Sequence, residues 1–158
     1  MAVKKTGSSA RVELSADASA WTTLALQLTA VQSRIDRELQ RRARLSLSDY
    51  LALHALAGNE IGELRIQELA DAVGLNQSSA SRLVTRLQDA GLTERRTCEV
   101  DRRGVYTGIR AEGYALLRQA TAVYEDALDA ALNSIANPKL ATALRKSLRL
   151  VATSGPPV

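Results

Sequence analysis

The sequence predicts a mainly α-helical chain that carries one small β-hairpin. Hydrophobic residues make up 46% of the 158 residues, yet Phe is absent and the aromatic residues are one Trp and four Tyr, which favours helix over sheet. Apolar residues recur at steps of three and four along most of the chain. Short strand-like runs occur only between Gly91 and Arg110. The length suits one domain, over residues 17–152.

The N-terminal part of this domain is expected to form two helices. Residues 1–16 and 153–158 mix Lys, Gly, Ser and Pro without periodicity and are expected to be flexible tails. A long helix is predicted over residues 17–43, where Trp21, Leu28 and Ile35 share an apolar face. Ser48 is the expected N-cap of a short second helix, residues 49–57.

The centre of the chain, residues 47–110, has the order of a winged helix-turn-helix. A two-turn helix from Ile66 stops at Gly74, and Asn76 caps another helix over residues 77–90. Two strands are predicted over residues 92–97 and 104–109, with a charged loop between them. Such an order is typical of proteins that read duplex DNA.

Two helices are predicted after this motif, within residues 111–152, and they are separated at Asn137-Pro138. The first carries an apolar band too wide for a single contact surface. The helices that flank the motif, residues 17–43 and 111–152, therefore have more apolar surface than they can bury against each other. We expect them to pair two copies of the chain in a symmetric homodimer.

The helix over residues 77–90 is the predicted recognition helix. Ala80, Leu83 and Leu87 lie on its packing face, and the opposite face is polar. Short hydroxyls let the backbone approach a major groove, while guanidinium and amide groups address base edges or phosphates. An ordinary solvated helix face is the alternative, but the turn before it and the hairpin after it favour DNA binding. The candidate DNA-binding residues here are Gln77, Ser78, Ser79, Ser81, Arg82, Thr85 and Arg86.

The hairpin loop supplies the other predicted contacts. From residue 82 to residue 110 there are seven Arg and no Lys against four acidic residues, so this stretch carries +3 of the net +4 charge. Arg102 and Arg103 are expected to reach the adjacent minor groove, whose negative potential attracts Arg. Asp101 beside them is expected to brace the loop.

An ordered series of motifs resembles the MarR family of bacterial transcriptional regulators. The series runs LSDYL at 47–51, QELADAVGL at 67–75, SSASRLVTRL at 78–87, GLTER at 91–95, DRR at 101–103 and EG at 112–113. The resemblance covers residues 20 to 150 and implies a homodimer that holds a pseudo-palindromic operator. It also implies repression as the commoner mode. The chain departs from the family at Arg65 and Arg110, where a hydroxyl cap is usual.

Relatives in this family respond to small phenolic or anionic ligands bound between the dimerisation helices and the winged lobe. Trp21 could stack on such a ligand, although a core or interface anchor is the more ordinary role for a Trp. His54 could respond to pH and Cys98 to oxidation, but both need environments that a sequence does not show. The ligand and the sensing mechanism stay open.

Other function classes have less support. One His, one Cys and the lack of nucleophile, phosphate-loop or metal-ligand motifs argue against an enzyme, a cofactor or a metal. A single Cys and the lack of a leader or a long apolar run predict a cytoplasmic protein without a membrane span. Two alternatives remain: a non-catalytic winged-helix interaction module, and a nonspecific nucleic-acid binder that uses the arginines between residues 34 and 44.

Overall fold

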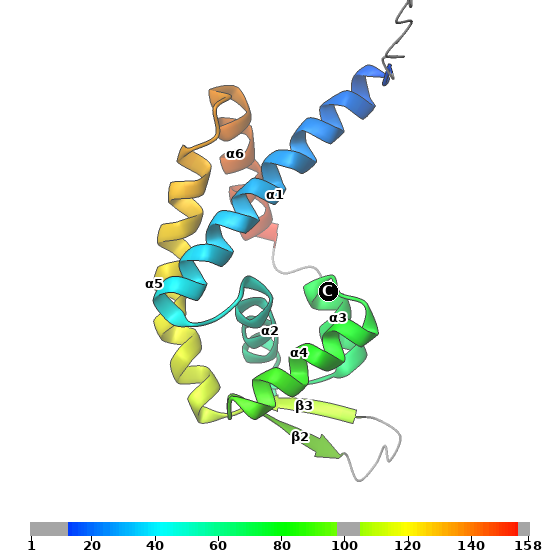
Figure 1. The fold of residues 1–158 in the computed structure, drawn as a ribbon, viewed down its shortest axis with the longest axis vertical. Coiled ribbons are helices and arrows are strands. Elements are labelled where there is room, and N and C mark those ends of the chain that lie inside the picture. Colours follow the sequence, from blue (N-terminus) through cyan, green and yellow to red (C-terminus); the bar gives the residue numbers. More distant parts are fainter. Residues whose placement is uncertain (1–12, 98–104, 155–158) are drawn as a thin grey trace, which may run out of the picture.

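The computed structural model describes residues 13–97 and 105–154, and these residues form six helices and three strands (Figure 1). The elements are α1 (Ala16–Ala43), α2 (Leu47–Gly58), β1 (Glu63–Arg65), α3 (Ile66–Val73), α4 (Gln77–Asp89), β2 (Thr93–Thr97), β3 (Val105–Ile109), α5 (Ala111–Asn133) and α6 (Pro138–Ser154). The mainly helical fold with a small wing is confirmed.

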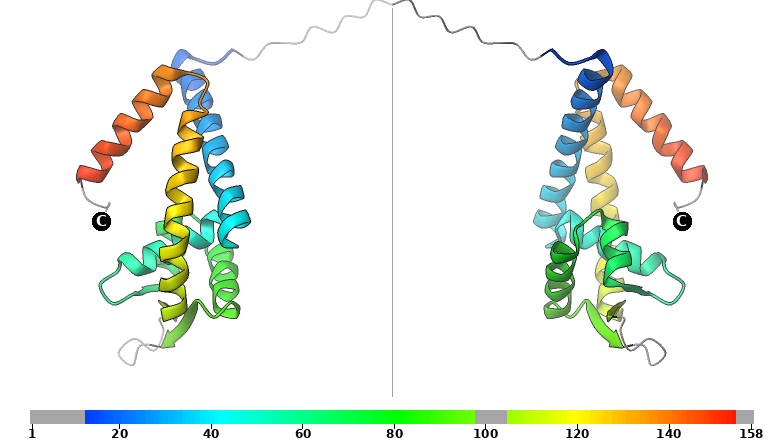
Figure 2. Two further views of the ribbon diagram at one scale, coloured as in Figure 1. Left: turned by 90° about the vertical axis from the view of Figure 1, so that its left-hand side faces the viewer. Right: turned by 90° about the vertical axis from the view of Figure 1, so that its right-hand side faces the viewer.

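The helices α1 and α5 lie side by side and form the frame of the molecule (Figures 1 and 2). The C-terminal half of α1 buries Val31, Ile35 and Leu39 against this frame, as the apolar spacing predicts. Helix α2 links the frame to the α3–α4 pair and contributes the fully buried Leu53 and Leu56. Helix α2 thus connects the frame to the winged lobe, which is made of α3, α4 and the sheet.

The turn between α3 and α4 has the predicted geometry. Gly74 ends α3 in the left-handed region, with φ of 71°, which a residue without Cβ adopts at little cost. The N–H of Leu75 then donates to the carbonyl of Ala70 at 2.8 Å. Asn76 caps α4 by accepting a hydrogen bond from the N–H of Ser79 at 2.9 Å. These caps fix the angle at which α4 leaves α3.

The wing contains one more strand than the sequence predicted. Strand β1 pairs antiparallel with β3, so the sheet order is β1-β3-β2 and β3 lies in the middle. With three residues, β1 is too short to show an alternating pattern. Because Arg65 ends β1 and Ile66 begins α3, the wing is joined directly to the first helix of the motif.

The expected cap of α2 was wrong by two residues. Ser46, not Ser48, is the N-cap, because its Oγ accepts from the N–H of Asp49 at 3.1 Å while Asp49 accepts from the N–H of Ser46 at 3.0 Å. The missing hydroxyl caps at Arg65 and Arg110 are confirmed. At α3, Glu68 compensates in part by accepting from the N–H of Arg65 at 2.9 Å.

Candidate DNA interface

The polar face of α4 is turned toward solvent. Its opposite face is buried against α2, α3 and β2, through Ala80, Leu83, Val84 and Leu87. The structure therefore brings the seven candidate residues of this helix to one side. Five of them are exposed, namely Gln77, Ser78, Arg82, Thr85 and Arg86, and two are half-buried, namely Ser79 and Ser81.

The two arginines of α4 have different surroundings. Nη2 of Arg82 makes a long hydrogen bond of 3.4 Å to Oγ of Ser79, one turn earlier on the same helix. Arg86 instead donates from Nη2 and Nε to Oδ1 of Asp49 on α2, at 2.5 and 3.2 Å. The side chain of Arg82 thus has one long hydrogen bond within α4, whereas the side chain of Arg86 is fixed by an ion pair to α2.

Asp49 is a buried junction between α2 and α4. Its side chain is 10% exposed, and its Oδ2 accepts from the N–H and the hydroxyl of Ser46 at 3.0 and 2.6 Å. Its Oδ1 holds Arg86. One carboxylate therefore caps α2 and orients a side chain on the recognition helix, a role that the sequence analysis did not assign.

A groove of about 400 Å³ lies between α4, the start of α3 and the sheet. Its lining residues are Arg65, Ile66, Gln67, Gln77, Ser81, Arg95 and Val105. Gln77 and Ser81 were predicted site residues, but Gln67 and Arg95 were missed. Strand alternation could have found Arg95, because it shares a face of β2 with the buried Thr93 and thus points toward the helices. The groove adds a cation and an amide to the polar surface of α4.

The predicted wing residues Asp101, Arg102 and Arg103 lie outside the described residues, as does Cys98. Their roles stay predictions. The described strands β2 and β3 lie at the lower edge of the molecule in Figure 1, below α4.

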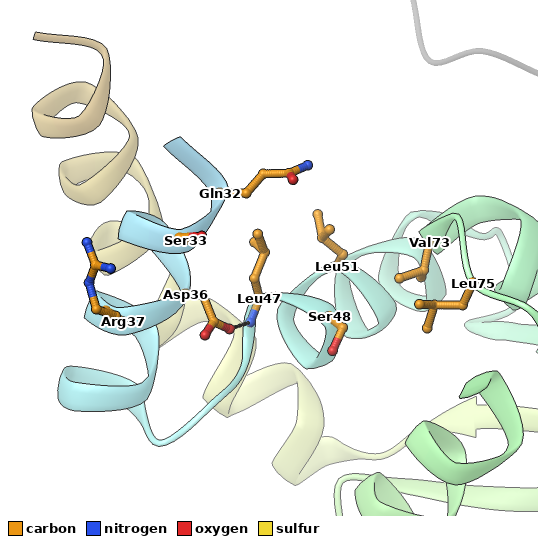
Figure 3. Close-up of a pocket in the computed structure, with 9 residues that line it drawn as sticks. All are labelled: Gln32, Ser33, Asp36, Arg37, Leu47, Ser48, Leu51, Val73 and Leu75. Atoms are coloured by element: carbon orange, nitrogen blue, oxygen red, sulfur yellow. Dashed lines mark hydrogen bonds between the residues drawn. The ribbon is translucent and has the colours of Figure 1, made fainter. Parts of the chain in front are cut away.

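A second cavity, of about 460 Å³, lies between α1, α2 and the α3–α4 turn (Figure 3). Its lining residues are Gln32, Ser33, Asp36, Arg37, Leu47, Ser48, Leu51, Val73 and Leu75. Oδ1 of Asp36 accepts from the N–H of Leu47 at 2.7 Å and so ties α1 to the first turn of α2. The cavity combines an apolar wall with polar groups at one end.

Two residues that the sequence singled out as sensors are placed elsewhere. Trp21 is 67% exposed in this single chain and does not line the cavity between α1 and α2. His54 is exposed on α2, with its ring 6.2 Å from that of Tyr50. The core role considered for Trp21 is therefore wrong within one chain.

The basic cluster near the end of α1 is partly neutralised by acidic residues. Arg41 pairs with Glu38 at 2.6 Å, and Arg42 pairs with Asp126 of α5 at 3.1 Å. The hydrogen bond from Arg41 lowers the pKa of Glu38, and the same contact raises the pKa of Arg41. These pairs leave less positive charge for a nonspecific polyanion than the sequence alone indicates.

Large apolar side chains are uncovered at the far end of the frame. The N-terminal half of α1 extends beyond the other helices, and α6 stands away from α5 (Figures 1 and 2). On α6, Leu144 of the apolar stripe is only half-buried. The exposed apolar residues of this end are Leu14, Trp21, Leu26, Leu28, Leu148, Leu150 and Val151.

Comparison with known proteins finds similarity to MarR family regulators. The MarR family model matches residues 45–104, which run from the start of α2 into the wing. The chain is also similar to Sco3205 from Streptomyces coelicolor, a MarR family transcriptional regulator solved in complex with DNA, with 29% identity, a TM-score of 0.73 and coverage of 93% of this chain and 92% of that one. The chain is thus similar to MarR family transcriptional regulators, both in the segment that the family model matches and in its overall fold.

Other solved structures have the same fold. AbsC, a MarR family transcriptional regulator from Streptomyces coelicolor, is 26% identical over 91% of this chain and 97% of its own, with a TM-score of 0.71. BpsR from Bordetella bronchiseptica, whose DNA binding is regulated by 6-hydroxynicotinic acid, is 19% identical over 82% of this chain and 98% of its own. With a TM-score of 0.64, it shares the fold of this chain. A comparison with curated proteins gave no match.

Within residues 13–97 and 105–154, each helix is too short or too polar to span a bilayer. The same residues contain no group of three or more His, Cys, Asp or Glu side chains that could hold a metal ion.

Proposed function

We propose that this chain is a MarR family regulator, a sequence-specific reader of double-stranded DNA that represses transcription and is released by a small ligand. One observation carries the proposal: the face of α4 that bears Ser, Thr, Gln and Arg is open to solvent, while the opposite face holds the helix in the core. Such a regulator would act in the cytoplasm, where bacterial DNA lies.

The chemistry of this face suits the edges of base pairs. The guanidinium of Arg82 can donate in bidentate fashion to guanine, and the amide of Gln77 can do the same to adenine. The short side chains Ser78 and Ser81 leave room for the helix to approach a major groove. In the adjoining groove, Arg95 and Gln67 are placed to donate to backbone phosphates, which fix the register of the protein on the duplex.

The proposed partner for the uncovered apolar end of the frame is a second copy of the chain. Trp21 and Leu28 are seven residues apart and share one side of α1, and both are exposed in the single chain. On α6, Leu148 and Val151 are also exposed. A symmetric dimer formed there would present two α4 helices to half-sites about 34–36 Å apart, so the operator is expected to be pseudo-palindromic.

The proposed ligand site is the cavity between α1 and α2. Leu47, Leu51 and Val73 offer an apolar wall for a ring, while Arg37 favours an anionic group. We therefore propose a small aromatic acid as the ligand. Because the cavity joins the frame to the α3–α4 turn, occupancy would change how the two α4 helices are spaced.

Selection of bound duplexes from a random pool tests the proposal. The selected duplex should bind at least about 10³-fold more tightly than random DNA, and Arg82→Ala should reduce this preference by about 1–3 kcal/mol. The same binding assay in the presence of 4-hydroxybenzoate tests release, with Arg37→Ala as the variant that should resist it. Equal affinity for all duplexes would reject a sequence-specific reader and favour a nonspecific binder.

A further inference from the structure

The face of the sheet that points away from the core carries a cluster of charged residues. Antiparallel pairing places Glu94 of β2, Gly108 of β3 and Glu63 of β1 in one row across the three strands. The next row contains Arg96, Tyr106 and Arg65. Nε of Arg65 donates to Oη of Tyr106 at 2.8 Å. Strand β1 is thus linked to the middle strand by a polar side-chain contact as well as by backbone hydrogen bonds.

All three nitrogens of the Arg96 guanidinium donate hydrogen bonds within this cluster. Nε and Nη2 donate to Oε1 of Glu94 on the same strand, at 2.8 and 2.6 Å. Nη1 donates to Oε1 of Glu63, two strands away. The side chain of Glu63 is only 19% exposed, so its carboxylate is largely withdrawn from water. The hydrogen bonds to Glu94 and then to Glu63 raise the pKa of Arg96, so they favour its charged form.

Gly108 makes this long reach possible. A Cβ at this position would lie 3.1 Å from Nε of Arg96 and 3.3 Å from Cγ of Glu63. Both distances are tighter than ordinary van der Waals contact, so a side chain on the middle strand would push the guanidinium aside. The glycine thus provides the path by which Arg96 passes over β3.

We infer that Arg96 is a positioning residue that ties the wing to the first helix of the helix-turn-helix, and that it does not contact DNA. Glu63 belongs to β1, which runs directly into α3, so the bridge from β2 to β1 fixes the root of the wing relative to α3 and α4. Arg95 points to the opposite face of β2, into the groove beside Gln77. We therefore expect Arg95 to contact DNA and Arg96 to bridge the strands. The contact of Arg95 with DNA rests on the proposed function, whereas the bridge between Arg96 and Glu63 does not.

Hydrogen exchange of the free protein tests the bridge without DNA. In Arg96→Ala, amides of β1 and β3 should exchange about tenfold faster than in the unsubstituted protein, because the ion pair to Glu63 across the sheet and the ion pair to Glu94 on β2 are both lost. Glu63→Gln removes one of these contacts with little change in size and should show a smaller increase. The double variant Arg96→Glu/Glu63→Arg restores opposite charges and should recover slow exchange. Unchanged exchange in both single variants would overturn the inference.

The salt dependence of operator binding separates positioning from contact. Each phosphate contact contributes a slope of about −0.9 to the plot of log K against log salt concentration. Arg95→Ala, the matched control, should reduce the magnitude of the slope by about 0.9. Arg96→Ala should weaken binding severalfold with an unchanged slope, and the charge-reversed pair should restore affinity. A loss of slope in Arg96→Ala like that in Arg95→Ala would show a DNA contact and overturn the inference. If the unsubstituted protein selects no duplex, the proposed function fails, while the exchange experiment still decides the bridge.

Discussion

Arg86 on the recognition helix is bound to Asp49 on α2 through a 2.5 Å ion pair, although its side chain is 55% exposed. The carboxylate of Asp49 is buried and also closes the capping box of α2. The carboxylate of Asp49 therefore both fixes Arg86 on the polar face of α4 and belongs to the capping box at the start of α2. This arrangement limits the conformations that Arg86 can adopt before DNA arrives, which lowers the entropy cost of a contact.

Replacing Asp49 with Ala should lower both stability and operator affinity. The substitution removes the Asp49 half of the capping box of α2 and leaves Arg86 without its partner, so we expect the free energy of unfolding to fall by about 2 kcal/mol. Urea denaturation measures this change, and a binding titration with the selected duplex measures affinity. Asp49→Asn, which keeps an acceptor for the cap but removes the charge, should retain more stability. If Asp49→Ala were as stable as the unsubstituted protein, the contacts of Asp49 with Ser46 and Arg86 would not contribute to stability.

The two arginines of α4 should respond differently to removal. Arg82→Ala is expected to cost about 1–3 kcal/mol of specific binding and to relax the preference at one base position, with little change in stability. Arg86→Ala should weaken binding and also destabilise the fold, because Asp49 then lacks its ion pair. Competition titrations against single-base variants of the operator, with parallel denaturation curves, give both quantities. A uniform loss on all duplexes would assign Arg82 to a phosphate.

Elements with a strong local signal were predictable from the sequence. Steps of three and four fixed the helices, and Gly74 with Asn76 marked the turn, because each of these depends on neighbours a few residues away. Strand β1 was missed because its pairing with β3 connects Leu64 to Thr107, far along the chain. The cap of α2 was misplaced because two serines stand beside the helix start, and only the contact with Asp49 distinguishes them.

The candidate site shows the same limit. The polar face of α4 follows from helical periodicity, so its seven residues could be named in advance. The partners of those residues could not: Asp49 is 37 positions from Arg86. Likewise, only the sheet register shows that Arg95 enters the groove while Arg96 reaches Glu63. Sequence spacing thus identifies a surface, whereas the folded chain decides which of its charges are free.

The proposed dimer makes Trp21 an informative probe. Trp21 is the single Trp and is 67% exposed in one chain, so burial by a second copy should shift its fluorescence to shorter wavelength as concentration rises. Trp21→Ser should weaken dimerisation by about 2 kcal/mol, which sedimentation equilibrium can measure. Ile61→Ser, at an equally exposed apolar residue on the turn before β1, is the control and should leave the dimer intact. A monomer at micromolar concentration would contradict the dimer.

Stability should fall at alkaline pH through Tyr124. Burial, and then the nearby Tyr50, raise the pKa of Tyr124 above its ordinary value of 10.0, and the two rings stack at 4.5 Å. The folded state thus favours the neutral phenol. Its contribution is complete below the unfolded value and is lost as pH rises through the raised folded value. Denaturation from about pH 8 to about pH 11 should show this loss, and Tyr124→Phe should be less sensitive in that range.

The sequence-based role of Arg103 can be tested by changing the DNA beside the operator core. A guanidinium in a minor groove gains most where A/T-rich sequence narrows that groove and strengthens its negative potential. Arg103→Ala should therefore lower affinity more for operators with A/T-rich flanks than for those with G/C-rich flanks. Arg96→Lys, which keeps a positive charge on the root of the wing, is the control and should preserve the flank preference of the unsubstituted protein. An equal loss on both kinds of flank would assign Arg103 to a phosphate instead of the minor groove.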